Sequence, residues 1–134
     1  MAITSSCLRF LLGIGLCIGI ASAPAAIAAL EPLSPSELEG ALSELPGWQS
    51  DGMSLTCTYR FSTFVDAIAF VNQLVEPAER IGHHPDLAIS YNTVGIALTT
   101  HDAGGLTTLD TQLAKELVQI SSAQGLSACV APNE

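Results

Sequence analysis

The sequence predicts an α+β domain in which helices pack on one face of a four-stranded antiparallel sheet. Short segments of alternating apolar and polar residues occur in two pairs, each pair joined by a tight turn. Three longer segments repeat apolar residues near the helical period. The resulting order is helix, strand, strand, helix, strand, strand, helix, which is typical of helices segregated on an antiparallel sheet.

The first thirty residues differ from the rest of the chain. Arg9 is the only charged side chain before Glu31, and residues 10–23 are strongly apolar. The small-x-small pattern at residues 26–28 is typical of signal-peptidase sites. We therefore expect a signal peptide over residues 1–28, a mature domain over 29–134, and export to a periplasm or thylakoid lumen. A retained membrane anchor is the alternative, since an uncharged segment of this length nearly spans a bilayer.

Without residues 1–28 the chain keeps thirteen acidic and three basic residues, a net charge near −10. Such a surface repels phosphate backbones, so no nucleic-acid partner is expected. Cys57 and Cys129 are the two cysteines outside the predicted signal peptide. An exported protein can join such a pair in a disulfide. The sequence supplies no geometry, so two free thiols remain an alternative.

The domain is predicted to open with a helix over residues 35–45. Ser34 is its N-cap, Glu37 completes a capping box, and a Pro-Gly pair ends it. A strand around Trp48 follows, and an Asp-Gly turn leads from it into a second strand over residues 55–61. These segments form the first helix and the first hairpin.

The main helix is predicted over residues 63–80, with Pro77 distorting its last turn. Its apolar stripe consists of Phe64, Ile68, Val71, Val75 and Ala78. Two strands follow over residues 87–91 and 93–100, joined by a tight turn at Asn92.

A last helix is predicted after Thr107, its N-cap residue, with Asp110 in the capping-box position. Its apolar stripe consists of Leu109, Leu113, Leu117 and Ile120. The tail from Ser121 onward is small and polar, and we expect it to fray.

All three histidines fall within nineteen positions. His83 and His84 follow the main helix, and His101 follows the fourth strand. Because the third and fourth strands form a hairpin, the start of one lies beside the end of the other. Glu79 precedes His83 by four positions and can lie on the same side of the last helical turn. The four side chains are therefore predicted to converge at one end of the sheet.

Three interpretations compete for this cluster. Histidines at strand ends are often plain surface residues. A metal site would use Glu79, His83 and His101, but the adjacent His83 and His84 cannot both readily point at one ion, so no metal is predicted. Acid–base chemistry suits imidazoles, whose ordinary pKa of about 6.5 lets them donate and accept protons at neutral pH.

The run Glu-x-x-x-His-His-Pro, a tyrosine after it, and "TTHDAGGLT" followed by an aspartate resemble the pterin-4a-carbinolamine dehydratase family. The resemblance extends over residues 38–117 and includes the pair Gly47-Trp48. It implies an enzyme that dehydrates 4a-hydroxytetrahydropterin to quinonoid dihydropterin. It also implies that no metal or organic cofactor is used and that subunits associate into homodimers or homotetramers.

The resemblance also implies roles for single residues. His83 and His101 would be the acid–base histidines, and Glu79 the carboxylate that orients its partner imidazole. His84 would contact the substrate. The other positions implied to shape or flank the pocket are Trp48, Pro85, Thr100, Asp102 and Asp110. Leu109 departs from the family pattern, because many members carry a basic residue there.

The alternative function is a catalytically silent relative that binds or assembles other proteins. Export favours this alternative, because the pterin-dependent hydroxylases served by the family work inside the cell. A scaffold, however, has no reason to keep Glu79, three histidines and Trp48 together. The sequence therefore predicts a hydro-lyase that acts on a small pterin by histidine acid–base catalysis.

Overall fold

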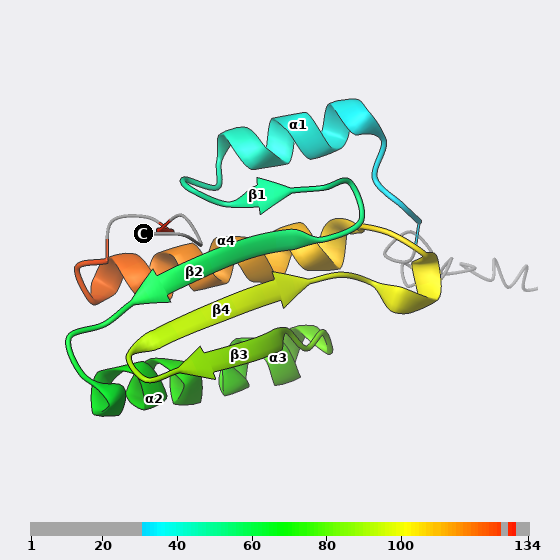
Figure 1. Ribbon diagram of the computed structural model, residues 1–134. Helices are drawn as coiled ribbons and strands as arrows, with labels where there is room; N and C mark the ends of the chain where they lie inside the picture. The colour runs from blue at the N-terminus through cyan, green and yellow to red at the C-terminus, as the bar shows by residue number, and fades with distance from the viewer. Residues whose placement is uncertain (1–30, 127–128, 131–134) are drawn as a thin grey trace, which may run out of the picture.

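The computed structural model describes residues 31–126 and 129–130 (Figure 1). The signal peptide predicted for residues 1–28 lies outside this part of the chain. The described elements are α1 (Pro35–Ser43), β1 (Gln49–Ser50), β2 (Leu55–Arg60), α2 (Phe64–Gln73), α3 (Val75–Ile81), β3 (Asp86–Ser90), β4 (Thr93–Leu98), a short 3-10 turn (His101–Ala103) and α4 (Thr108–Ala123).

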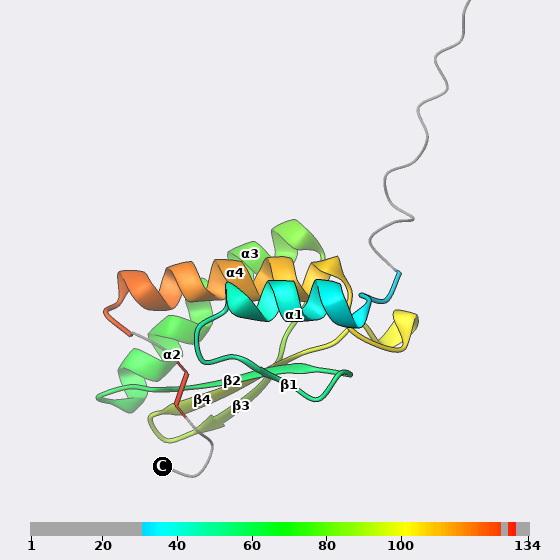
Figure 2. The same ribbon diagram turned by 90° about the horizontal axis from the view of Figure 1, so that it is seen from above.

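The strands form one antiparallel sheet in the order β1-β2-β4-β3. The central strands β2 and β4 pair along their whole length, from Leu55 opposite Leu98 to Arg60 opposite Thr93. β3 forms one edge of the sheet, and the two-residue β1 forms the other. The helices lie against one face of this sheet (Figure 2). The predicted α+β class and the antiparallel sheet are confirmed.

The core lies between the central strands and the helices. Every second residue of β2 is buried, and the same holds for β4, as expected for strands with one covered face. The ring of Phe70 in α2 packs 5.3 Å from that of Tyr59 in β2. Leu113 and Leu117 of α4 are fully buried in the same cluster. The buried side chains of the two alternating strands and those of the helices therefore form one apolar layer.

The predicted capping boxes are confirmed. The Ser34 backbone N–H donates to Glu37 Oε2 at 2.8 Å, and the Ser34 hydroxyl accepts from the Glu37 backbone N–H. The Ser34 hydroxyl also donates to Glu37 Oε2 at 2.6 Å. This hydrogen bond and the one from the Ser34 backbone N–H hold the pKa of the Glu37 carboxyl below its usual value. Thr107 and Asp110 form the equivalent box at the start of α4. Both helices therefore begin where their side chains satisfy the first free N–H groups.

The main helix predicted over residues 63–80 is two helices, α2 and α3, which meet at Leu74. Pro77 lies in the first turn of α3 rather than distorting a last turn. A proline is tolerated there because first-turn N–H groups have no partner within the helix. The prediction of one continuous helix was wrong.

The stripe predicted for this segment was also partly wrong. Phe64 and Val75 are about half exposed, at 49% and 56%, whereas Ala67, Phe70 and Leu74 are buried. Apolar residues occur on several sides of this segment, so periodicity alone does not select the buried face. The break at Leu74 then shifts the helical register for the residues after it.

The tail does not fray in the part that the structure describes. Ser121 is buried, and its hydroxyl donates to the hydroxyl of Tyr59 at 3.2 Å. Cys57 and Cys129 form a disulfide with their Cα atoms 5.3 Å apart. The backbone N–H of Val130 donates to the carbonyl of Thr58 at 2.7 Å. The predicted fraying was therefore wrong for residues 121–126 and 129–130, because α4 continues to Ala123 and the disulfide holds Cys129.

Two cationic side chains join neighbouring helices. Lys115 of α4 pairs with Glu44 at the end of α1. Arg80 of α3 pairs with Glu116 of α4 at 3.0 Å and with Glu76 at 3.1 Å, and these carboxylates raise the pKa of Arg80. Among the residues from 31 to 126, no helix is long and apolar enough to cross a membrane.

We expect Phe70→Ala to lower the free energy of unfolding by about 3–5 kcal/mol, because it empties a fully buried site. Phe64→Ala is the matched control, since it removes the same ring from a half-exposed position. Urea unfolding followed by circular dichroism measures both changes. An equal loss for the two variants would contradict the assignment of the buried face.

Candidate functional site

Three segments meet at one end of the sheet. They are the residues that follow α3, the turn that follows β4, and the first turn of α4. Gly82 ends α3 with a φ of 70°, a left-handed conformation that favours glycine. The backbone N–H of His83 then donates back to the carbonyl of Ala78 at 3.1 Å. This helix end turns the chain sharply toward β3 and determines where the two histidines lie.

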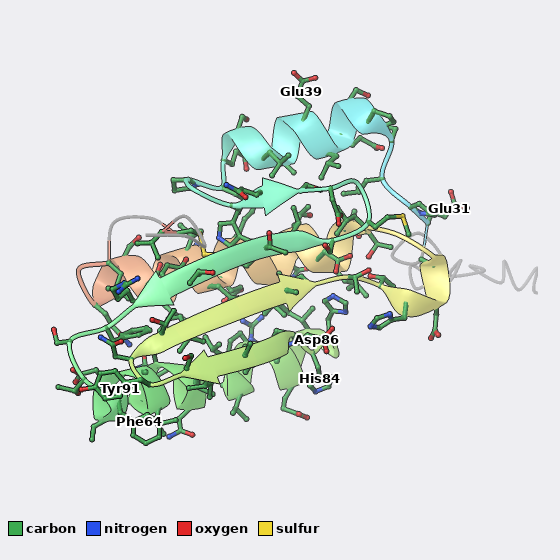
Figure 3. The ribbon with its side chains drawn as sticks, in the orientation of Figure 1. Glu31, Glu39, Phe64, His84, Asp86 and Tyr91 are labelled. Carbon is green, nitrogen blue, oxygen red and sulfur yellow. A yellow bond between two sulfur atoms is a disulfide. The ribbon has the colours of Figure 1, made fainter. Side chains whose placement is uncertain are left out.

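His83 and His84 occupy different environments although they are adjacent. His83 is buried, with 8% of its surface exposed, whereas His84 is exposed. Successive side chains of an extended chain point to opposite sides. One imidazole therefore lies inside the domain beneath the site, and the other lies at the surface. Figure 3 labels His84 beside Asp86, where β3 begins.

The partner of His83 is Asp110, whose carboxylate has no exposed surface. Nε2–H of His83 donates to Asp110 Oδ1 at 2.7 Å. The other carboxylate oxygen, Oδ2, accepts from the hydroxyl of Thr100 at 2.8 Å and from the backbone N–H of Thr107 at 2.7 Å. The two threonine hydroxyls also lie 2.8 Å apart. The carboxylate is thus satisfied on both oxygens, as a buried polar group requires.

The exposed histidines have looser partners. His84 Nε2 lies 2.9 Å from Glu79 Oε1, and both side chains are more than half exposed. His101 Nε2 lies 3.9 Å from Asp86 Oδ2, with both side chains at least three-quarters exposed. Solvent weakens exposed pairs of this kind. These two imidazoles are therefore held far less rigidly than His83.

Glu79 was predicted to lie on the side of His83, but the structure pairs it with His84. The helix ends at Gly82, so the four-residue helical spacing does not continue to His83. The carboxylate beneath His83 comes instead from Asp110, 27 residues away in sequence. The family resemblance implied a place for Asp110 in the substrate pocket. Its complete burial places it behind the histidine rather than at the surface that a substrate would touch.

A hollow of about 340 Å³ lies over this end of the sheet. That size is within the range of about 300–1,000 Å³ found for small-molecule sites. It brings together all three histidines, Thr100 and Asp102 from the sequence prediction. Its full lining is Gly82, His83, His84, Thr99, Thr100, His101, Asp102 and Leu109.

Besides Glu79 and Asp110, two more predicted site residues do not line this hollow. Trp48 is buried in the core, and its indole N–H has no hydrogen-bond partner among the described residues. Pro85 lines a separate apolar groove of about 190 Å³ between β3 and the helices α2 and α3, and that groove also reaches His84 and Glu79. The described chain therefore does not offer Trp48 as a stacking surface at the histidines.

Three residues of the site were not predicted to belong to it. Thr107 was recognised only as a helix cap, and Gly82 and Thr99 were not singled out. The capping box could have indicated that Asp110 has a further partner. The box uses one oxygen of the Asp110 carboxylate and leaves the other free to accept from another donor. Nothing local to the sequence, however, indicated that this donor would be a histidine.

The described residues contain no group of three or more histidine, cysteine or acidic side chains placed to hold a metal ion. What the hollow presents is one buried imidazole backed by a carboxylate and two exposed imidazoles. Neutral imidazole has one nitrogen that donates and one that accepts. The arrangement can therefore transfer protons to and from a small bound molecule.

Comparison with known proteins connects this geometry to a family. The model of the family described as "Pterin 4 alpha carbinolamine dehydratase" matches residues 31–120. A protein of Thermosynechococcus vestitus, provisionally named a pterin-4-alpha-carbinolamine dehydratase, is 52% identical over 91 residues, which is 68% of this chain and 96% of that protein. A protein of Nostoc sp. with the same provisional name is 54% identical over 89 residues, 66% of this chain and 96% of its own.

A solved structure agrees with these relatives. The crystal structure of a transcriptional coactivator/pterin dehydratase from Brucella melitensis is similar with a TM-score of 0.64 and 37% sequence identity. The match covers 67% of this chain and 98% of that one. The similarity therefore spans nearly the whole of each relative.

We expect Asp110→Ala to lower the free energy of unfolding by about 3–5 kcal/mol, the usual cost of removing one partner of a buried pair. The change leaves His83 and the buried donors of Thr100 and Thr107 without their acceptor. Asp102→Ala, at an exposed position of the same hollow, is the control and should change stability little. Urea titrations at neutral pH give both values, and equal values would argue against the network.

Proposed function

The chain belongs to the pterin-4a-carbinolamine dehydratase family, and we propose that it dehydrates a 4a-hydroxytetrahydropterin to the quinonoid dihydropterin. One observation carries the proposal. His83, held by the buried Asp110, lines the same hollow as His84 and His101. A protein that only bound a partner could use the His83–Asp110 pair for stability, but it would have no use for three imidazoles at the wall of one hollow.

The reaction is a loss of water. The bond from the ring carbon to its hydroxyl oxygen breaks, and that oxygen leaves with a proton supplied by an acid. The adjacent ring nitrogen gives up its proton to a base, and its electron pair forms the new double bond to the carbon. One charged and one neutral imidazole are sufficient for these two transfers. No oxidant or reductant takes part.

His83 fits the role of base. Its Nε2–H is donated to Asp110, so Nδ1 is the ring nitrogen that carries the lone pair. Asp110 fixes the tautomer and lies where positive charge develops when Nδ1 takes up a proton. Burial holds the ring in one orientation, which is what a positioned proton acceptor needs.

His101 fits the role of acid. It lies on the short turn after β4, with its side chain 80% exposed. Gly104 adopts a φ of 68° at the end of this turn, and Thr100 and Gly105 bridge its base. An exposed imidazole can be recharged with a proton from water after each turnover. His84, paired with Glu79, would then contact the substrate at the opposite rim of the hollow.

We also propose that the protein works outside the cytoplasm. The sequence pattern of residues 1–28 predicts cleavage and export. The Cys57–Cys129 disulfide supports this location, because disulfides persist in oxidising compartments.

A third proposal is self-association through one surface. All five residues of the edge strand β3 are exposed. Phe64 and Tyr91 lie close together at the far end of β3 from His84 (Figure 3). The apolar edge surface that we define here consists of Phe64, Val75, Leu87, Ile89 and Tyr91, which are 39% to 71% exposed. An open edge strand flanked by large apolar side chains favours pairing with a second copy.

For catalysis, we expect His83→Ala and His101→Ala each to lower kcat by about 10²–10⁴-fold, the usual effect of losing a positioned acid or base. The double variant should lose less than the product of the two, because both groups serve one step. His84→Ala should raise KM more than it lowers kcat. A dehydration assay with a synthetic carbinolamine measures these rates.

Glu39→Ala is the control for this series, because Glu39 is an exposed residue of α1 that does not line the hollow. Thermal melts must accompany His83→Ala, since that residue is buried. If the double variant stays folded and dehydrates the substrate at the wild-type rate, the histidines are not the catalyst. The alternative of a catalytically silent binding or assembly protein would then be favoured.

For export, we expect the chain recovered from an exporting cell to begin at Ala29, as determined by N-terminal sequencing. Ala28→Phe should leave the leader attached, because signal peptidase requires small residues at the site. A soluble cytoplasmic chain that begins at Met1 or Ala2 would contradict the proposal.

For self-association, we expect Ile89→Lys to shift the protein toward monomer in sedimentation at micromolar concentration, because a charge on the edge strand opposes pairing. Met53→Lys is the matched control, since Met53 is also a large apolar side chain, 56% exposed against 43% for Ile89, but lies in the β1–β2 turn. Wild-type protein that sediments only as monomer would contradict the proposal.

A further inference from the structure

The outer edge of β2 is covered in two sections. β1 pairs only with Leu55 and Thr56, at the start of the strand. No residue of β1 lies opposite the residues of β2 that follow Thr56. There the backbone N–H of Val130 donates to the carbonyl of Thr58 at 2.7 Å. The C-terminal segment therefore continues the edge cover where β1 stops.

The chain before β1 leaves room for this segment. Extending the β1 register from Gln49 opposite Thr56 would bring Gly47 opposite Thr58. Gly47 instead has a φ of +81°, and the chain turns away from β2. A Cβ atom at Gly47 would lie 2.8 Å from the backbone nitrogen of Cys129. Glycine at this position both bends the chain and admits the segment.

The attachment of the segment depends on the disulfide. Among the residues that the structure describes, one backbone hydrogen bond joins this segment to β2, from Val130 N–H to the carbonyl of Thr58. One such bond contributes only about 0.5–1.5 kcal/mol to stability. The disulfide to Cys57 adds a covalent link to the buried face of the same strand. Cys129 also lies beyond residue 120, where the match to the family model ends. The attachment is therefore an addition to the region that the family model covers.

We infer that the Cys57–Cys129 disulfide is a redox latch, a bond that holds the segment of Cys129 and Val130 on β2 when oxidised and releases it when reduced. The segment covers the edge of β2 beyond Thr56. A dithiol reductant opens the latch by thiol–disulfide exchange. The Cys57–Cys129 bond takes up two electrons and two protons and becomes two thiols, while the dithiol becomes a disulfide. Reduction then exposes the carbonyl of Thr58 and the edge beyond Thr56.

Hydrogen exchange on the full chain tests the latch at single amides. In the oxidised protein, the Val130 amide should be protected. It should exchange at least about tenfold faster after treatment with dithiothreitol, and also in Cys129→Ser, because the covalent restraint is lost. The Leu33 amide, which donates to the carbonyl of Leu106 at 2.7 Å, is the internal control and should keep its rate.

Two further comparisons make the test decisive. Adding dithiothreitol to Cys129→Ser should change neither amide, which shows that the reductant acts through this disulfide. Unchanged protection of Val130 in the reduced chain would overturn the proposal. Equal acceleration of Val130 and Leu33 would also overturn it, because the disulfide would then stabilise the whole domain rather than hold one segment.

Discussion

The buried carboxylate of Asp110 is the interaction on which both the fold and the site depend. It caps α4 through Thr107, holds the end of β4 through Thr100, and holds the segment after α3 through His83. A buried carboxylate is costly unless every oxygen is satisfied. The three segments must therefore come together for the carboxylate to be satisfied, and they meet at the hollow lined by His83 and Thr100.

This constraint divides the site into a buried part and an exposed part. His83 has one partner, one tautomer and almost no freedom, because its nitrogen serves a carboxylate with no exposed surface. His84 and His101 lie on exposed turns with weak partners. In the proposed reaction the buried ring of His83 would remove the proton, and the exposed rings would deliver a proton and contact the substrate. The two sides of the sheet also differ. The edge strand β3 is exposed, whereas the part of β2 beyond Thr56 is bonded to the segment of Cys129 and Val130.

The elements of the fold were largely predictable because their signals are local. Capping boxes involve residues three positions apart, and strand alternation involves every second residue, so the sequence shows them directly. The incorrect predictions concerned features that depend on how the helices pack. The division between α2 and α3 and the buried face around Phe70 follow from what these helices meet, which periodicity does not specify.

The sequence by itself determined the fold class, the starts of α1, α2 and α4, and the convergence of three histidines, because hairpin pairing and caps follow from neighbouring residues. Only the tertiary structure decided which carboxylate serves which histidine. Asp110 reaches His83 across 27 positions, and Cys129 reaches Cys57 across 72. Such contacts depend on how separate elements pack. The end of α3 at Gly82 places Glu79 beside His84 rather than His83.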